Sequence, residues 1–169
     1  MIIEKERIIS YTGHRPGPKI FKSDYYSDEN FNTLVDFACQ VLLREKPDLS
    51  ITGGALGWDQ AVAQASLNLA MPYELHIPFE GFDSNWPTKS RNRLKDLMES
   101  AEKVKVVCGS YSLGAYQKRN ESMVDTSDKV IALFDFSSGG TANCVSYAKS
   151  KNKPITHVYH AWLEYRDAK

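Results

Sequence analysis

Short apolar runs alternate with segments of helical periodicity along most of the 169-residue chain. The helical pattern is clearest over residues 28–46, where Phe31, Leu34, Val35 and Val41 recur at the spacing of one helix face. Pro47 follows directly and predicts the end of this helix. The same reading predicts further helices over residues 58–70, 90–101, 116–126 and 142–151, and strands over 7–12, 49–52, 73–77, 103–107, 129–134 and 154–158.

This alternation of strands and helices indicates a parallel sheet that is buried on both faces. Because parallel crossovers are right-handed, the helices should cover both sides of the sheet. We therefore expect an α/β fold, a single doubly wound, mostly parallel Rossmann-like sheet with helices on both faces, and one domain over residues 1–169. The strand positions expected to lie in the core are Val104, Val106, Ile131, Leu133 and Ile155.

Four loops that follow predicted strands contain glycine together with polar residues. They are Thr-Gly-His-Arg-Pro at 12–16, Gly-Gly-Ala-Leu-Gly-Trp-Asp at 53–59, Pro-Phe-Glu-Gly at 78–81 and Ser-Gly-Gly-Thr at 138–141. In doubly wound sheets ligands bind beyond the carboxyl ends of the strands, near the point where the strand order reverses. The four loops are therefore expected to meet at one ligand site.

The loop from Ser138 to Thr141 predicts a phosphate-binding turn. Glycine lets backbone N–H groups approach a phosphate closely, and the start of the following helix favours negative charge. We expect a positive φ at Gly140. Arg119, beside Asn120 on the preceding predicted helix, adds a permanent fork-shaped cation. The alternative interpretation of Arg119 and Asn120 is a solvated helix face.

The loop after the first strand offers a second cation. Gly13 permits a sharp turn, and Arg15 can clamp a phosphate bidentately. His14 is a candidate acid or base. The alternative is a structural turn that leaves His14 and Arg15 in solvent.

The second loop resembles a dinucleotide fingerprint but lacks its exact glycine spacing. Gly53, Gly54 and Gly57 can let backbone amides face a ligand. Asp59 can accept a hydrogen bond from a ribose hydroxyl or a base amine, or simply stabilise the first turn of its helix. Trp58 can stack on a base or pack at the start of the helix.

The amino-acid composition restricts the classes of partner that we expect the protein to bind. The 21 basic residues balance the 21 acidic ones, so no global field attracts nucleic acid or an anionic membrane, and nucleic acid is an unfavoured partner. The three cysteines are far apart and lack metal-ligand spacing, which predicts neither a metal nor a cofactor and fits a reducing cytoplasm. No apolar run approaches the ~20 residues that span a bilayer. Early charged residues are not typical of a signal peptide.

Together these motifs resemble the SLOG superfamily of Rossmann-like proteins, nearest to its small bacterial and phage YspA/YpsA-like branch. The resemblance rests on the four loops, on Trp86-Pro87 and on Arg119-Asn120. The same motif order is similar to the Rossmann core of DprA, which binds single-stranded DNA. It is more distantly similar to the Lonely Guy phosphoribohydrolases, which cleave the base from nucleoside monophosphates. The resemblance implies a nucleotide or nucleotide-derived ligand and a homo-oligomer.

The resemblance leaves open whether the ligand is cleaved. Lonely Guy enzymes pair an arginine, in an Arg-Lys-x-x-Met helix, with a glutamate two residues after the Gly-Thr of the glycine loop. Arg119 and Met123 match that helix, but Asn143 stands at the glutamate position. A neutral amide cannot act as a carboxylate base. The candidate replacements are Glu80, Asp59 and Glu121.

Three functions remain open at this point. A protein that senses or sequesters a nucleotide explains both the anion loops and the missing glutamate, and we favour it. The alternatives are an N-glycosidic hydrolase and a single-stranded-DNA-binding module. The residues expected to contact the ligand are Gly13, His14, Arg15, Gly53, Gly54, Gly57, Trp58, Asp59, Pro78, Glu80, Arg119, Asn120, Ser138, Gly139, Gly140, Thr141 and Asn143.

Overall fold

A computed structural model describes residues 5–169, so the first part of the charged N-terminal stretch lies outside the described residues. Six parallel strands form one sheet in the order β4-β3-β2-β1-β5-β6. The strands are β1 (Ile8–Gly13), β2 (Leu49–Thr52), β3 (Tyr73–Ile77), β4 (Lys103–Val106), β5 (Lys129–Leu133) and β6 (Ile155–His157).

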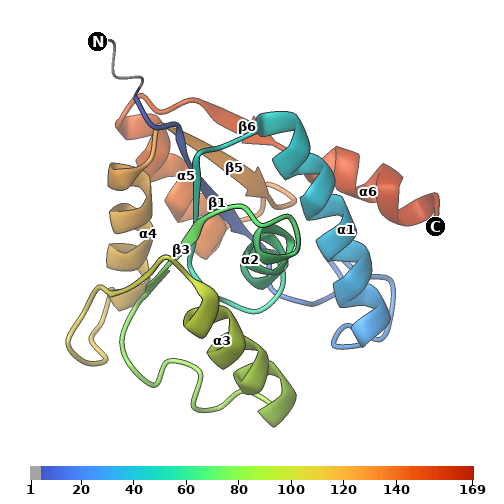
Figure 1. The fold of residues 1–169 in the computed structure, drawn as a ribbon, viewed down its shortest axis with the longest axis horizontal. Helices are drawn as coiled ribbons and strands as arrows, with labels where there is room; N and C mark the ends of the chain where they lie inside the picture. Colours follow the sequence, from blue (N-terminus) through green and yellow to red (C-terminus); the bar gives the residue numbers. More distant parts are fainter. Residues whose placement is uncertain (1–4) are drawn as a thin grey trace.

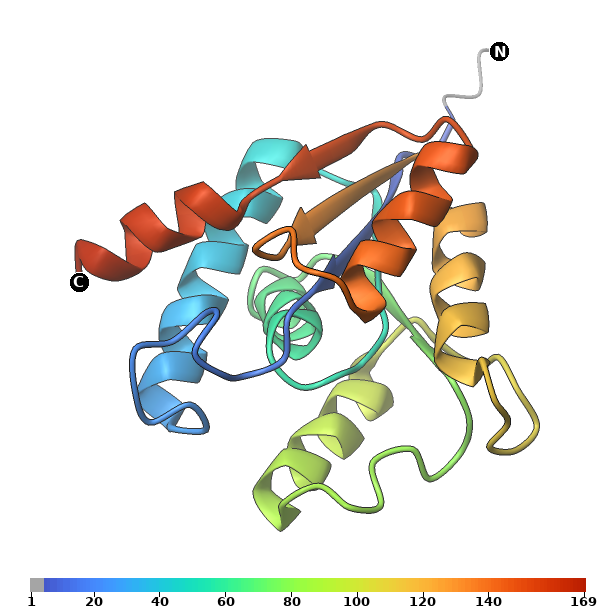
Figure 2. The same ribbon diagram turned by 180° about the vertical axis from the view of Figure 1, so that it is seen from behind.

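Helices cover both faces of this sheet (Figures 1 and 2). One face carries α1 (Asp28–Glu45), α2 (Trp58–Asn68), α3 (Thr88–Ser100) and α6 (Tyr159–Asp167). The other carries α4 (Ala115–Thr126) and α5 (Gly140–Ser150), which pack side by side. The predicted α/β fold with a doubly wound parallel sheet is confirmed.

The strand order reverses between β1 and β5. From β1 the chain builds β2, β3 and β4 on one side, and then returns to place β5 and β6 on the other. The chain therefore leaves the adjacent carboxyl ends of β1 and β5 toward opposite faces, into α1 and α5 respectively. Such a switch point opens a crevice between the two departing loops.

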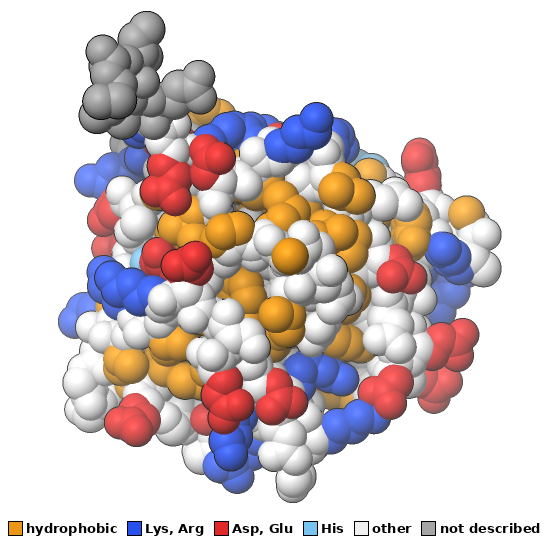
Figure 3. All heavy atoms as spheres, in the orientation of Figure 1, with side chains coloured by type: hydrophobic (Ala, Val, Ile, Leu, Met, Phe, Trp, Pro, Cys, Tyr) orange, Lys and Arg blue, Asp and Glu red, His pale blue; other side chains and the backbone are white. Residues whose placement is uncertain are grey.

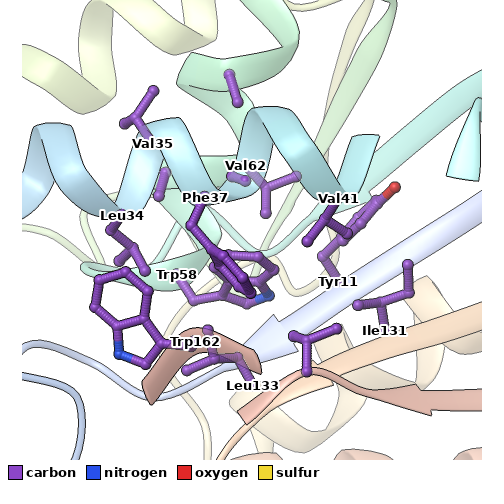
Figure 4. Close-up of a cluster of buried hydrophobic side chains, with 14 of the residues drawn as sticks. Tyr11, Leu34, Val35, Phe37, Val41, Trp58, Val62, Ile131, Leu133 and Trp162 are labelled. Atoms are coloured by element: carbon purple, nitrogen blue, oxygen red, sulfur yellow. The ribbon is translucent and has the colours of Figure 1, made fainter. Parts of the chain in front are cut away.

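The largest buried cluster lies between the sheet and α1, α2 and α6 (Figure 4). Trp58 at the start of α2 and Trp162 of α6 are both fully buried, and both rings contact Phe37 of α1, with centroids 5.9 and 5.5 Å away. Helix α6 was not predicted from the sequence. It is held in place because Trp162 Nε1 donates a hydrogen bond to the carbonyl of Ile20 at 2.9 Å.

The expected core positions are only partly confirmed. Ile131 and Leu133 are fully buried, Ile155 and Val104 are half-buried, but Val106 is 48% exposed. The prediction for Val106 was wrong because β4 is the edge strand of the described sheet, and three of its four residues are exposed. A run of alternating Lys and Val suits such an edge, since charged side chains discourage pairing with another strand.

Helix α1 shows how local sequence sets an element's limits. The Ser27 hydroxyl accepts from the N–H of Asn30 at 3.1 Å and caps the first turn. The helix ends where Lys46 adopts a left-handed conformation, φ 51°, and its N–H donates to the Leu42 carbonyl at 2.8 Å. This position is usually a glycine, so the lysine stores some backbone strain.

The molecular surface in the same orientation mixes charges of both signs around an apolar centre that lies over α2 (Figure 3). No continuous basic band crosses this face. Within the described part of the chain, none of the helices combines the length and the apolar character needed to cross a bilayer.

Candidate functional site

The switch point holds a cleft of about 540 Å³. Ligand sites in proteins have volumes of roughly 300–1,000 Å³, so a nucleotide-sized molecule fits. The loops after β1 and β5, the start of α2 and the inner face of α4 contribute its walls. The lining residues are Thr12, Gly13, His14, Arg15, Pro16, Gly17, Pro18, Lys19, Ala55, Asp59, Tyr116, Arg119, Asn120, Met123, Ser137, Ser138, Gly139, Gly140, Thr141 and Ala142.

Arg119 lies at the base of the cleft with only 6% of its surface exposed. Its Nη1 donates to the Gly53 carbonyl at 2.6 Å, and its Nε donates to Oδ1 of Asn120 at 2.9 Å. A Cβ atom on Gly53 would lie 2.5 Å from that Nη1. Gly53 therefore makes room for the guanidinium, and the carbonyl of Gly53 holds it in place.

Asp59 lines the cleft beside Arg119 and is equally buried. Its Oδ2 accepts from the Ala55 N–H at 3.3 Å, whereas no protein group among residues 5–169 hydrogen-bonds to the buried Oδ1. Burial raises the pKa of Asp59 to about 6, although the positive charge of Arg119 opposes the shift. The carboxyl therefore changes charge close to neutral pH.

The glycine loop begins α5 directly. Gly139 is the N-cap, with φ 144°, and no side chain caps the helix. The first N–H groups of a helix have no partner within the helix, so these amides are available at the cleft wall. Positive φ occurs at Gly139 and not at Gly140, which corrects the expectation from the sequence. A Cβ on either glycine would meet no atom within 4 Å, so both face open space.

Helix α4 is tied to this loop. Asn120 Nδ2 donates to the Gly140 carbonyl at 3.4 Å, and the same Asn120 accepts from Arg119. One residue of α4 thus fixes the relative position of the buried cation and the glycine turn.

Two further side chains line the mouth of the cleft. Arg15 is exposed, and its guanidinium carbon lies 5.9 Å from the centroid of the Tyr116 ring. Arg119 lies 5.8 Å from the same ring. The sequence analysis did not single out Tyr116, yet it stands three residues before Arg119, the spacing that puts two side chains on one helix face.

His14 is held by a residue that the sequence analysis missed. Its Nε2 lies 3.0 Å from both the backbone nitrogen and Oδ1 of Asp135. The Ser137 hydroxyl and N–H also donate to that Oδ1, and Lys19 Nζ lies 2.6 Å from the Ser137 hydroxyl. Hydrogen bonding from Ser137, above all, lowers the pKa of Asp135 to about 2, and burial lowers the pKa of His14. Asp135 stands two residues beyond the end of β5. This position at the carboxyl end of a strand could have identified Asp135 as a site residue from the sequence.

A sequence model of the YspA SLOG family matches residues 9–165. The chain belongs to the YspA SLOG family. The SPbeta prophage-derived protein YoqJ of Bacillus subtilis is 34% identical over 127 residues, which cover 65% of this chain and 74% of YoqJ.

Two solved structures are similar to this YspA SLOG fold. DNA processing protein A (DprA) of Helicobacter pylori, reported with a single-stranded DNA binding mode, aligns with a TM-score of 0.63 and 17% identity, over 90% of this chain and 65% of DprA. The molybdenum cofactor binding protein of Rippkaea orientalis aligns with a TM-score of 0.58 and 17% identity, over 90% of this chain and 76% of that protein. Identities this low show a shared fold. Because one of these two neighbours is reported with single-stranded DNA, the comparisons do not support the expectation that nucleic acid is an unfavoured partner.

Several residues expected at the site of this YspA SLOG protein lie outside the lining. Trp58 is fully buried, so it cannot stack on a base. Gly57 forms the turn before it, with φ 88°. Asn143 is exposed on α5. The expected residues that do not line the cleft are Gly53, Gly54, Gly57, Trp58, Pro78, Glu80, Glu121 and Asn143.

The donor set does not favour a metal. Within residues 5–169, no three or more histidine, cysteine, aspartate or glutamate side chains come together as metal ligands would. Cationic groups instead outnumber acids in the lining, where Arg15, Lys19 and Arg119 accompany the single carboxylate of Asp59. This charge balance suits an anion.

Proposed function

We propose that the cleft binds a nucleotide or a nucleotide-derived molecule, and that the protein senses or sequesters it. The observation that carries this proposal is the pairing of a buried, hydrogen-bonded Arg119 with the uncapped glycine turn of α5 in one cleft. A buried guanidinium and free helix N–H groups both stabilise a phosphate. Arg15 adds an exposed cation to the lining.

A small molecule is favoured over a nucleic acid strand. The known fold neighbours include a protein that binds molybdenum cofactor and one that binds single-stranded DNA, so the fold accommodates both. This chain has a net charge of zero, and its candidate site is a confined cleft. A strand-binding site would instead need a basic groove that follows the backbone, and its affinity would fall steeply with salt.

We propose binding without cleavage. Asn143 is exposed outside the cleft, and neither Glu80 nor Glu121 lines it, so none of these side chains is aligned with the proposed ligand. The second candidate function is N-glycosidic hydrolysis with Asp59 as the carboxyl group. It is favoured by one observation, which is that Asp59 lines the cleft with a pKa of about 6.

Calorimetric titration with a panel of nucleoside mono- and diphosphates tests the proposal. Loss of a charge-assisted hydrogen bond costs about 1.5–3 kcal/mol, or roughly ten- to a hundredfold in affinity, so Arg119→Ala should weaken binding by that factor. Arg15→Ala, at an exposed position, should also weaken it. Arg93→Ala is the matched control, because Arg93 lies outside the cleft over Phe31.

Equal dissociation constants for wild type, Arg15→Ala and Arg119→Ala would exclude this cleft as the phosphate site. Chromatography of the same mixtures decides the chemistry. Free base that is released by wild type and not by Asp59→Asn would replace the binding function with the hydrolase.

We also propose the domain organisation, the cellular location and the oligomeric state of the protein. We place residues 1–169 in one nucleotide-binding domain that acts in the cytoplasm as a homo-oligomer. Size-exclusion chromatography with light scattering tests the oligomer.

A further inference from the structure

We infer that Tyr116 recognises the base of the ligand by stacking, with Arg15 as the opposite wall of the slot. This inference rests on the proposed function and assigns it a ligand class, nucleoside phosphates whose planar base contributes to affinity. Among the described residues that line the cleft, Tyr116 and His14 are the aromatic ones. The His14 side chain is only 14% exposed and is held by Asp135, which leaves the Tyr116 ring to face a ligand.

The Tyr116 ring is held by aromatic neighbours. It lies in the first turn of α4, next to the fully buried Ala115. Phe79, from the loop after β3, meets the ring at 5.8 Å with the planes nearly perpendicular, and Phe79 itself contacts Tyr111 in the same way at 5.5 Å. A ring that is fixed by its neighbours loses little conformational entropy when a base stacks on it.

The spacing of the slot is close to what a flat ring requires. Carbon atoms in contact are roughly 3.5 Å apart, so a base between two walls needs a separation of roughly 7 Å. The Arg15 guanidinium carbon lies over the Tyr116 ring, 5.9 Å from its centroid, so the two side chains are close enough to form opposite walls once Arg15 moves outward. Arg15 is exposed and its guanidinium packs on the Tyr116 ring, so a small movement of this side chain opens the slot.

The slot and the phosphate site fit one molecule. Tyr116 precedes Arg119 by three residues, about 4.5 Å along the helix axis, and both side chains contact the same cleft as the glycine turn. A phosphate on the α5 amides and Arg119 thus leaves the base next to Tyr116. Stacking is tolerant of base identity, so purines and pyrimidines should both bind, with purines tighter because their rings are larger.

Parallel titrations with adenosine 5′-monophosphate, guanosine 5′-monophosphate and ribose 5-phosphate test the inference. Tyr116→Leu should weaken binding of both nucleotides by about five- to a hundredfold and leave ribose 5-phosphate unchanged. Tyr116→Phe keeps the ring and should bind like wild type. Tyr26→Leu is the control, because Tyr26 is exposed and lies outside the cleft.

A second measurement needs no variant. On binding to wild type, the base protons of adenosine 5′-monophosphate should move upfield in the NMR spectrum through the ring current of Tyr116. Unshifted base protons, or nucleotide affinity that survives Tyr116→Leu, would overturn the stacking role while the phosphate site stands. Absence of saturable nucleotide binding by wild type would overturn the proposed function and the stacking role together.

Discussion

Replacing Asp59 by asparagine removes a buried acid from the base of the cleft. The side chain is 6% exposed, and burial is the main cause of its raised pKa. Asparagine is close in shape and cannot ionise. The comparison between wild type and Asp59→Asn therefore isolates the ionisation of one carboxyl group.

The size of the expected change in stability follows from the linkage between proton binding and folding. The pKa of Asp59 is 3.8 in the unfolded chain and about 6 in the native protein. Between these values the native state holds a proton that the unfolded state has lost, so the free energy of unfolding falls as the pH rises. This difference in pKa corresponds to about 3 kcal/mol of stability, which is present below pH 4 and lost once the pH exceeds about 6.

The charge of Arg119 is already part of this pKa, because its attraction to the ionised carboxylate opposes the rise. Well below pH 6 the carboxyl of Asp59 is neutral like the amide of the variant, so any stability difference that remains between the two side chains is nearly the same at every pH and cancels when two pH values are compared. The quantity to examine is therefore the change with pH in the stability difference between wild type and variant.

Urea denaturation at pH 4 and pH 7.5 measures this quantity. Relative to Asp59→Asn, wild type should lose about 2–3 kcal/mol of stability between the two pH values. Asp135→Asn is the matched control and should show almost no change in its stability difference between these two pH values. The pKa of Asp135 is lowered to about 2, so its contribution is present above about pH 4 and is lost only as the pH falls from about 4 to about 2. A stability difference for Asp59→Asn that does not change with pH would refute the reasoning.

Three further predictions concern two glycines at the site and the end of helix α1, the last with a second substitution as its control. Gly53→Ala should destabilise the protein by about 1–3 kcal/mol and weaken nucleotide binding, because the added Cβ would lie 2.5 Å from Nη1 of Arg119. An unchanged melting temperature would contradict this prediction. Gly140→Val should leave the melting temperature unchanged, because its Cβ meets nothing within 4 Å, but its side chain should block the approach of the ligand. If calorimetry gives this variant the same affinity for the nucleotide as wild type, the turn does not bind the ligand. Lys46→Gly should raise the free energy of unfolding by about 1 kcal/mol, because glycine adopts the positive φ of this position without strain. Lys118→Gly inside α4 is the control and should lower the free energy of unfolding by about 1 kcal/mol, so a change in the same direction for both variants would contradict the strain at Lys46.

The sequence was sufficient for the sheet and most helices because their apolar spacing is regular. Strands 49–52 and 73–77 are observed with the predicted bounds. Helix α6 was missed because it is short, with nine residues, and only Trp162 is buried. Its stability comes from tertiary contacts with α1 and Ile20, which no local pattern records.

The loops that form the site were recognisable, but the direction of each side chain was not. Helix α2 is buried on nearly all sides, between α1, α3 and the sheet. A helix without a polar face gives no sign of which residue turns toward the cleft. Sequence alone therefore could not separate Asp59, which lines the cleft, from Trp58, which enters the core. The role of Asp135 depends on His14, which is 121 residues distant in sequence.

The central claim is that the cleft between β1 and β5 receives the phosphate of a nucleotide. Titration of ¹⁵N-labelled protein with adenosine 5′-monophosphate, followed by backbone amide chemical shifts, tests it most directly. The account predicts the largest saturable shifts at Gly139, Gly140 and Thr141, together with Arg15, and little change along the outer face of α3. Saturable shifts confined to α3 or β4, with the amides of the glycine turn unmoved, would contradict it.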